Sequence, residues 1–219
     1  MKIMFSAGEA SGDLHGSNLA RSLRELDPQI ELLGMGGKEM AAAGVDIVYD
    51  IKNLGVIGVG EIIRLRDFLV DTMRKEKPDV LVCIDYPGFN MRLIKAAKAA
   101  GIPVVYYILP TIWAWHKSRG KTIAKYTDLA ISLFPFEAKM YEDMGTNVIY
   151  AGHPLVDTVH ATMSRREACA HFGLDERKKT VLLMPGSRVQ EVRGLLPCML
   201  EAAKLIRKEA GDVQFILPK

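Results

Sequence analysis

Short apolar runs alternate with amphipathic stretches along the chain, and no other feature of the sequence constrains its fold as strongly. Residues 3–7 and 79–85 are typical of buried strands, and each is followed by a turn and then by apolar residues at helical spacing. Strands and helices that alternate in this way build βαβ units, in which the strands lie parallel within one sheet. We therefore expect an α/β, Rossmann-like fold with a doubly wound parallel sheet.

The same patterns place the other elements. Further strands are expected at 31–34, 104–109, 129–133, 148–150, 180–184 and 213–217. Helices are expected around the apolar residues of 14–26, 62–73, 91–100 and 196–206. The first of these helices would place Leu14, Leu19, Leu23 and Leu26 on one apolar side.

The strand–helix–strand unit that begins near residue 180 is about 40 residues long, too short to bury a core alone. We predict a first Rossmann-like domain at 1–165, a linker region at 166–178 and the truncated start of a second Rossmann-like domain at 179–219.

Composition excludes several classes of protein. Of the 219 residues, 49% are hydrophobic and 25% charged, which suits a folded globular protein and not a disordered chain or a disulfide-stapled miniprotein. The formal net charge of +3 is too small to demand a nucleic-acid partner. Cys83, Cys169 and Cys198 lie far apart, without metal-site spacing, which favours a reducing cytoplasm.

Because the sequence has no signal peptide and no apolar run of about 18 residues, we expect a cytoplasmic protein that is at most peripherally bound to a membrane.

Loops at the carboxyl ends of parallel strands are where α/β proteins bind ligands, and the first such loop is rich in glycine. Gly8 and Gly12 allow a close approach of the backbone, and the following helix offers free N–H groups to an anion or a sugar hydroxyl. Ser11 and Asp13 would either contact that ligand or cap the helix. The loop has neither dinucleotide-binding nor phosphate-loop spacing, so it predicts a substrate-binding site without naming the substrate.

A carboxylate ends the strand at 79–85, which is otherwise apolar. Partly screened from water, Asp85 would have a raised pKa and could act as a general base, whereas the alternative is a turn or helix-capping aspartate. Asn90 closes the same loop and is a candidate substrate contact.

Three later loops add candidate contacts. Trp113 and Trp115 share one loop, which favours a rigid wall against an apolar or sugar ligand over two independent core residues. Glu137 follows the next strand as a capping or hydrogen-bonding group. Arg188, in a Gly-Ser turn between a strand and a helix, would hold a phosphate or else pair with Glu191 on the surface.

Seven motifs follow one another in a specific order: GEASGD at 8–13, MGG at 35–37, IDYPGFN at 84–90, P-x-x-WAW at 110–115, PFE at 135–137, GHP at 152–154 and PGSR-x-x-E at 185–191. Together they resemble the lipid-A-disaccharide synthases, inverting glycosyltransferases built of two Rossmann-like domains (the GT-B fold). The resemblance covers the whole chain from Met1 to Lys219. It implies that 1–165 is the acceptor-side domain and that 179–219 begins the domain that binds the UDP-sugar donor.

The resemblance also implies a reaction in lipopolysaccharide biosynthesis. The family transfers 2,3-diacylglucosamine from UDP-2,3-diacylglucosamine to 2,3-diacylglucosamine 1-phosphate, giving lipid A disaccharide 1-phosphate and UDP, with no cofactor and no metal. Asp85 matches the suspected general base of the family, and Arg188 matches the arginine thought to support the phosphate-bearing half of the donor. Physical reasoning agrees, because an inverting displacement needs a base at the acceptor hydroxyl and positive charge at the leaving group.

The family associates with membranes through an apolar patch. Here the matching residues are Val56, Ile57, Val59, Ile62 and Ile63, with arginines following. Such a stretch suits the anionic surface of the inner membrane and the acyl chains of the substrates, whereas its alternative role is a buried loop and helix start.

The sequence departs from the family in three respects. Gly60 stands where a larger apolar residue is usual, which weakens the apolar patch. His116 stands where arginine is common, which puts a basic ligand contact after WAW in doubt. The family's donor-binding glycine-rich and acidic segments lie downstream of a strand like that at 213–217. We therefore expect these 219 residues alone to be inactive.

Two other functions stay open at this point. One is another nucleotide-sugar enzyme of the GT-B fold, such as a peptidoglycan transferase or a UDP-sugar epimerase, although neither would be expected to carry GEASGD together with WAW. The other, for the chain in isolation, is a noncatalytic lipid- or sugar-binding module. The sequence does not fix the oligomeric state.

Overall fold

The computed structural model describes residues 1–54, 59–113, 118–186 and 189–218, apart from the side chain of Val59. These residues form two compact units, unit 1 (Met1–Val156) and unit 2 (Asp157–Lys219), and each is described by itself. The functional domains expected at 1–165 and 179–219 stay a prediction.

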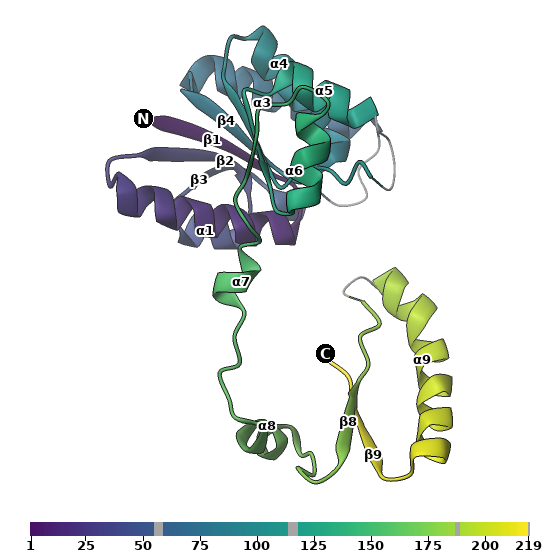
Figure 1. Ribbon diagram of the computed structural model, residues 1–219. Coiled ribbons are helices and arrows are strands. Elements are labelled where there is room, and N and C mark those ends of the chain that lie inside the picture. The colour runs from purple at the N-terminus through teal and green to yellow at the C-terminus, as the bar shows by residue number, and fades with distance from the viewer. Residues whose placement is uncertain (55–58, 114–117, 187–188, 219) are drawn as a thin grey trace. The chain divides into compact units, whose positions relative to one another are not determined.

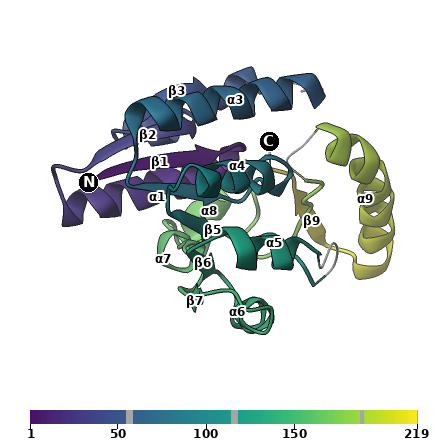
Figure 2. The same ribbon diagram turned by 90° about the horizontal axis from the view of Figure 1, so that it is seen from above.

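Unit 1 is built on a parallel sheet of seven strands, with α1 and α3 on opposite faces of it (Figures 1 and 2). The strands are β1 (Lys2–Ala7), β2 (Glu31–Gly36), β3 (Asp46–Asp50), β4 (Val80–Ile84), β5 (Val104–Tyr107), β6 (Leu129–Ser132) and β7 (Val148–Tyr150). Their order is β3-β2-β1-β4-β5-β6-β7, so the winding reverses between β1 and β4. The predicted doubly wound α/β fold is confirmed.

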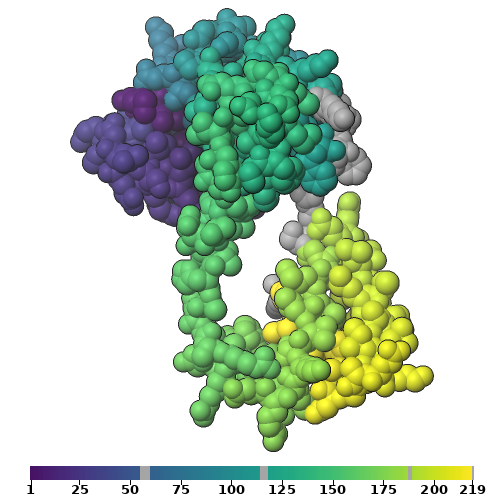
Figure 3. All heavy atoms as spheres, in the orientation of Figure 1, coloured from purple at the N-terminus to yellow at the C-terminus, as the bar shows by residue number. Residues whose placement is uncertain are grey.

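Helices and one short 3-10 turn connect these strands. They are α1 (Ala10–Leu26), α2 (Lys38–Ala42), η1 (Ile51–Asn53), α3 (Val59–Glu76), α4 (Pro87–Ala99), α5 (Ser118–Tyr126) and α6 (Pro135–Glu142). In the space-filling view, the purple N-terminal segments of unit 1 lie directly against teal segments far along the sequence (Figure 3).

The core of unit 1 lies on both faces of the sheet because side chains alternate along each strand. Met4 and Leu81 belong to the cluster that packs under α3 and α4. Phe5 and Val82 belong to the opposite cluster, under α1 and α2. This two-sided burial explains why the strands read as continuous apolar runs.

The prediction of one apolar side of α1 is wrong for Leu14 and Leu26, at the two ends of the helix. Leu14 and Leu26 are 43% and 85% exposed, and small residues face the sheet instead. A Cβ on Gly16 would come within 2.6 Å of the Met40 sulfur, so α1 lies too close to its neighbours for a larger side chain. This close approach brings the first turn of α1 to the carboxyl ends of β1 and β4.

The edge strand β3 was not among the strands predicted. Its three central residues are only half-buried, and an aspartate stands at each end. A short edge strand with charged ends carries a weak apolar signal, and its pairing with β2 also shifts register between Gly34 and Met35.

Unit 2 contains α8 (Arg165–Phe172), β8 (Lys179–Leu182), α9 (Val189–Ala210) and β9 (Val213–Ile216), while α7 (Leu155–Thr158) crosses the boundary between the units. The strands β8 and β9 pair in parallel, as predicted for a strand–helix–strand unit. Ser164 and Glu167 form a capping box that begins α8. Between residues 153 and 178 the elements are the two short helices α7 and α8, with turns and irregular segments around them.

Candidate active site

A cavity of about 260 Å³ lies in unit 1 at the carboxyl ends of the central strands. The segments that follow β1, β4, β5, β6 and β7 all reach it, and the segment after β1 does so through the first turns of α1. Its lining residues are Ser11, Gly12, His15, Asp85, Ile108, Leu109, Thr111, Leu133, Phe134, Glu137 and His153. The winding of the sheet reverses between β1 and β4, and this is the place where open α/β sheets bind their ligands.

Asp85 follows β4 in an unusual backbone conformation. Its φ is 46° and that of Tyr86 is 48°, both in the left-handed region, which costs of order 1–3 kcal/mol for such residues. Three hydrogen bonds hold the turn. The Asp85 N–H donates to the Tyr107 carbonyl at 3.1 Å, and its own carbonyl accepts from the Tyr106 hydroxyl and the Asn90 amide, each at 2.8 Å. These bonds fix the backbone of Asp85 and therefore the point from which its side chain extends.

The electrostatic setting of Asp85 suits a base. Burial raises the pKa of its carboxyl group, and the negative charge of Glu9 raises it further, while a hydrogen bond from the Tyr86 N–H opposes both effects. A carboxylate that is poorly solvated, with its pKa moved towards neutrality, is a better proton acceptor than an ordinary aspartate.

Asn90 is a supporting residue rather than a ligand contact. Its side chain is fully buried, and its amide oxygen accepts from the Ser6 hydroxyl at 2.6 Å. Its amide nitrogen donates to the carbonyls of Asp85 and Ser6. These bonds use the polar atoms of Asn90 within the protein, so the prediction that it contacts substrate is replaced by a role in holding the Asp85 turn.

Asp13 also serves the fold. Its carboxylate is 3% exposed and accepts three backbone N–H groups, from Gly37 at 2.7 Å and from Glu39 and Met40 at 3.0 Å. It thereby caps α2 from α1, a variant of the capping role that the sequence left open. Asp13 does not line the cavity, and its predicted role in substrate binding is not supported.

The other predicted residues of the first loop lie as follows. Ser11 and Gly12 line the cavity, and their contact with a ligand stays a prediction. Gly8 does not line the cavity. A Cβ at this position would collide with the ring of Tyr86, so only glycine lets that ring pack against the backbone of Gly8.

Glu137 and Trp113 meet beside the cavity. Glu137 is 6% exposed and burial raises the pKa of its carboxyl group, while a hydrogen bond from the Trp113 indole N–H, at 3.3 Å, opposes that shift. Trp113 itself is 54% exposed and packs edge-on against Phe136, with ring centroids 6.1 Å apart. Phe136 stacks on Phe134, which lines the cavity, at 5.7 Å. Of these three rings only that of Phe134 lines the cavity, and the wall expected from Trp113 stays a prediction.

Several predicted residues cannot be placed at the cavity. Trp115, His116 and Arg188 lie outside the described residues, as do Val56 and Ile57 of the expected membrane patch. Glu191 packs over Gly186 within unit 2.

The remaining patch residues lie in α3. Val59 begins the helix, Ile62 is half-buried against the core, and Ile63 is 44% exposed.

Sequence reasoning missed the apolar lining. Ile108, Leu109 and Leu133 gave no polar or glycine signal, although Ile108 has a left-handed φ of 63°. Their place at the carboxyl ends of the strands predicted at 104–109 and 129–133 was the one available clue.

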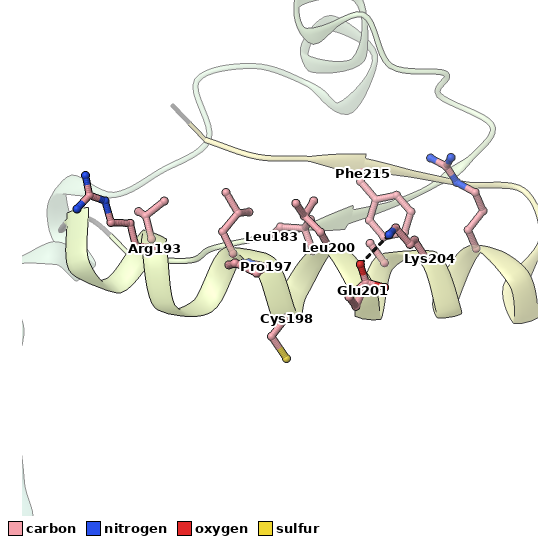
Figure 4. A pocket seen from close by; sticks show the side chains of 12 residues that line it. Leu183, Arg193, Pro197, Cys198, Leu200, Glu201, Lys204 and Phe215 are labelled. Carbon is pink, nitrogen blue, oxygen red and sulfur yellow. Dashed lines mark hydrogen bonds and ion pairs between the residues drawn. The ribbon is translucent and has the colours of Figure 1, made fainter.

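A larger apolar groove, of about 1110 Å³, lies in unit 2 (Figure 4). Leu183, Leu200 and Phe215 lie between α9 and the strands, whereas Cys198 points away from them. An ion pair joins Lys204 to Glu201 at 2.6 Å. Its described lining is mostly apolar, and its other charged residues are Arg193 and Arg207.

Within the described residues there is no cluster of three or more His, Cys, Asp and Glu side chains that could hold a metal ion. The helices of that part of the chain are also too short or too polar to cross a bilayer.

Solved structures with this fold include nucleotide-sugar enzymes. The UDP-GlcNAc 2-epimerase from Neisseria meningitidis, bound to UDP-GlcNAc, superposes with a TM-score of 0.71 at 13% identity and covers 100% of this chain and 66% of its own. MurG from Acinetobacter baumannii gives a TM-score of 0.52 at 12% identity over 99% of this chain and 65% of its own. At such identities the likeness shows the fold alone.

Sequence comparison goes further. Lipid-A-disaccharide synthases from Coxiella burnetii (strain Dugway 5J108-111) and Geobacter metallireducens are 47% and 46% identical over 99% of this chain. The chain spans 59% and 58% of the length of these relatives. A model of the lipid-A-disaccharide synthetase family matches residues 3–219. The chain therefore belongs to the lipid-A-disaccharide synthetase family.

Proposed function

We propose that this chain supplies the acceptor-side domain and the catalytic base of a lipid-A-disaccharide synthase, with residues 179–219 beginning the donor-side domain. One observation carries the proposal: Asp85 is a poorly solvated carboxylate that is held in a left-handed turn and lines a cavity. It belongs to the IDYPGFN motif and follows β4, next to the point where the winding of the sheet reverses. The family match over residues 3–219 supports the proposal, and the substrates are those that the resemblance of the motifs implies.

In the proposed reaction, Asp85 accepts the proton of the acceptor's 6-hydroxyl group while that oxygen forms a bond to the anomeric carbon of the donor sugar. The bond from this carbon to the pyrophosphate breaks, and UDP leaves with the electron pair. Attack from the face opposite the leaving group inverts the anomeric centre. Asn90 and Tyr106 act as positioning residues, because they hold the Asp85 carbonyl and not the substrate.

A chimera tests this function. Residues 1–219 are followed by the C-terminal part of the Coxiella burnetii relative that the chain does not cover. With UDP-2,3-diacylglucosamine and 2,3-diacylglucosamine 1-phosphate, we expect the chimera to form the disaccharide and UDP, and the 219-residue chain to form neither. A chimera that folds and releases no UDP would argue against the proposal.

The 219-residue chain offers a separate measurement. It should bind the acceptor 2,3-diacylglucosamine 1-phosphate even without turnover, because the cavity lies entirely within unit 1.

We also propose that the start of α3 contacts the anionic inner-membrane surface from the cytoplasm. Ile63 and Phe68 expose 44% and 45% of their surface on this helix, and Arg64 and Arg66 lie on it too. The Ile63→Asp variant should therefore sediment with vesicles containing phosphatidylglycerol several-fold less than the wild type. Leu26→Asp, which changes a leucine that is 85% exposed on α1, is the matched control and should bind as the wild type does. Equal sedimentation of all three proteins would refute the contact.

A further inference from the structure

The imidazole of His153 has no role in the proposed mechanism, yet it lines the same cavity as Asp85. It comes from the turn that follows β7 and belongs to the GHP motif at 152–154. Its ring lies 5.7 Å from that of Phe134 and 6.3 Å from that of His15, measured between centroids. These neighbours restrict the ring of His153 from two sides.

A backbone hydrogen bond fixes the orientation of this ring. The Leu155 N–H donates to Nδ1 of His153 at 3.2 Å. A ring nitrogen that accepts a hydrogen bond carries no proton, so the neutral imidazole holds its proton on Nε2. No residue of the described ranges accepts a hydrogen bond from this Nε2–H. His153, which lines the cavity, therefore has an oriented ring whose Nε2–H has no acceptor among the described residues.

The other polar groups of the cavity indicate what that donor would meet. The described lining holds the carboxyl groups of Asp85 and Glu137, the hydroxyls of Ser11 and Thr111 and the imidazole of His15, and it includes no lysine or arginine. Burial lowers the pKa of His15 and so favours its neutral form. A phosphate would face two carboxyl groups without a compensating cation. An uncharged sugar ring with hydroxyl groups matches these donors and acceptors, and its apolar face could pack against Phe134.

We propose that His153 is a substrate-binding residue, which donates its Nε2–H to an oxygen of the acceptor sugar while Asp85 accepts from a hydroxyl of the same ring. The sugar ring occupies the cavity and its 1-phosphate lies outside. The identity of the sugar rests on the proposed function, whereas the donor role of His153 rests on the geometry of its ring.

Two substitutions separate this role from a structural one. In His153→Asn the side-chain amide replaces Nδ1 and can still accept from the Leu155 N–H, but nothing replaces Nε2–H. In His153→Gln the amide N–H reaches the place of Nε2–H. The exposed His160→Asn in unit 2 is the matched control.

The experiment measures binding of 2,3-diacylglucosamine 1-phosphate in detergent micelles to the 219-residue chain. We expect His153→Asn to raise Kd about five- to tenfold, as the loss of one hydrogen bond would, and His153→Gln to stay within about threefold of the wild type. The control should bind as the wild type does. Removing the 1-phosphate from the probe should leave the effect of His153→Asn unchanged.

Each contrary result has a separate meaning. If the wild-type chain does not bind the probe, the proposed function fails. If the wild type binds and His153→Asn binds equally well, the donor role fails while the proposed function stands. If the effect disappears with the dephosphorylated probe, His153 contacts the phosphate and the placement of the ring is wrong. Unfolding midpoints of the variants show whether folding is preserved.

Discussion

Replacing Asp85 with asparagine in the chimera is expected to lower kcat by a factor of about 10³, within the range that general bases contribute. Asparagine has nearly the same shape, so the left-handed turn and its bonds to Tyr106 and Asn90 can persist. Its amide cannot accept the proton. Because the buried charge of Asp85 costs free energy, the variant should unfold at a urea concentration no lower than that of the wild type.

The Asp71→Asn variant is the matched control for Asp85. Asp71 is an exposed aspartate on α3 that pairs with Arg74 at 2.9 Å, and its replacement should leave kcat unchanged. If Asp85→Asn kept disaccharide synthesis within about threefold of the wild type, Asp85 would not be the base.

The acid side of the pH profile gives a second measure of the same group. The base works as a carboxylate, so activity falls as the pH falls through the pKa of Asp85. Because burial and Glu9 raise that pKa, the fall should come at a higher pH than for an ordinary aspartate. Glu9→Gln removes one of these causes and should move the acid limb to lower pH. An unmoved limb would mean that another group is being titrated.

The sequence predicted the parts of the fold that local patterns encode. Strands such as β1 and β4 are buried on both faces and therefore read as unbroken apolar runs. The inner side of α1 was mispredicted because it is decided by contact with another element: Gly16 lies against Met40, and no local pattern reveals that leucines would not fit.

The site was predicted with the same limits. Asp85 stood out because a carboxylate at the end of an apolar strand has few reasons to be there. Asn90 and Asp13 also stood out as polar residues in loops. They differ from Asp85 in that they are buried, make several hydrogen bonds within the protein and do not line the cavity. Those partners come from residues that are distant in the sequence or depend on turn geometry, so a single sequence does not reveal them.

Asp13→Ala tests this distinction and should destabilise unit 1 by about 3 kcal/mol or more. The substitution leaves the N–H groups of Gly37, Glu39 and Met40 without their acceptor in a buried place, and each such loss costs about 1–3 kcal/mol. Asp13→Asn should destabilise less, because its amide oxygen can still accept from Gly37 and Met40, while its NH₂ group would face the Glu39 N–H. Urea unfolding followed by tryptophan fluorescence measures this in unit 1 alone, since both tryptophans of the chain belong to that unit.

Asp50→Ala is the control for Asp13→Ala. Asp50 also caps a short helix, but it accepts one N–H, from Lys52 at 2.9 Å, in an exposed position. Its loss should cost about 1 kcal/mol or less. If Asp13→Ala unfolded within 1 kcal/mol of the wild type and yet lost binding of the acceptor probe, Asp13 would be a ligand contact after all. We expect the opposite result: a large loss of stability, with binding retained in the fraction that stays folded. That result would show that the Asp13 carboxylate serves to cap α2.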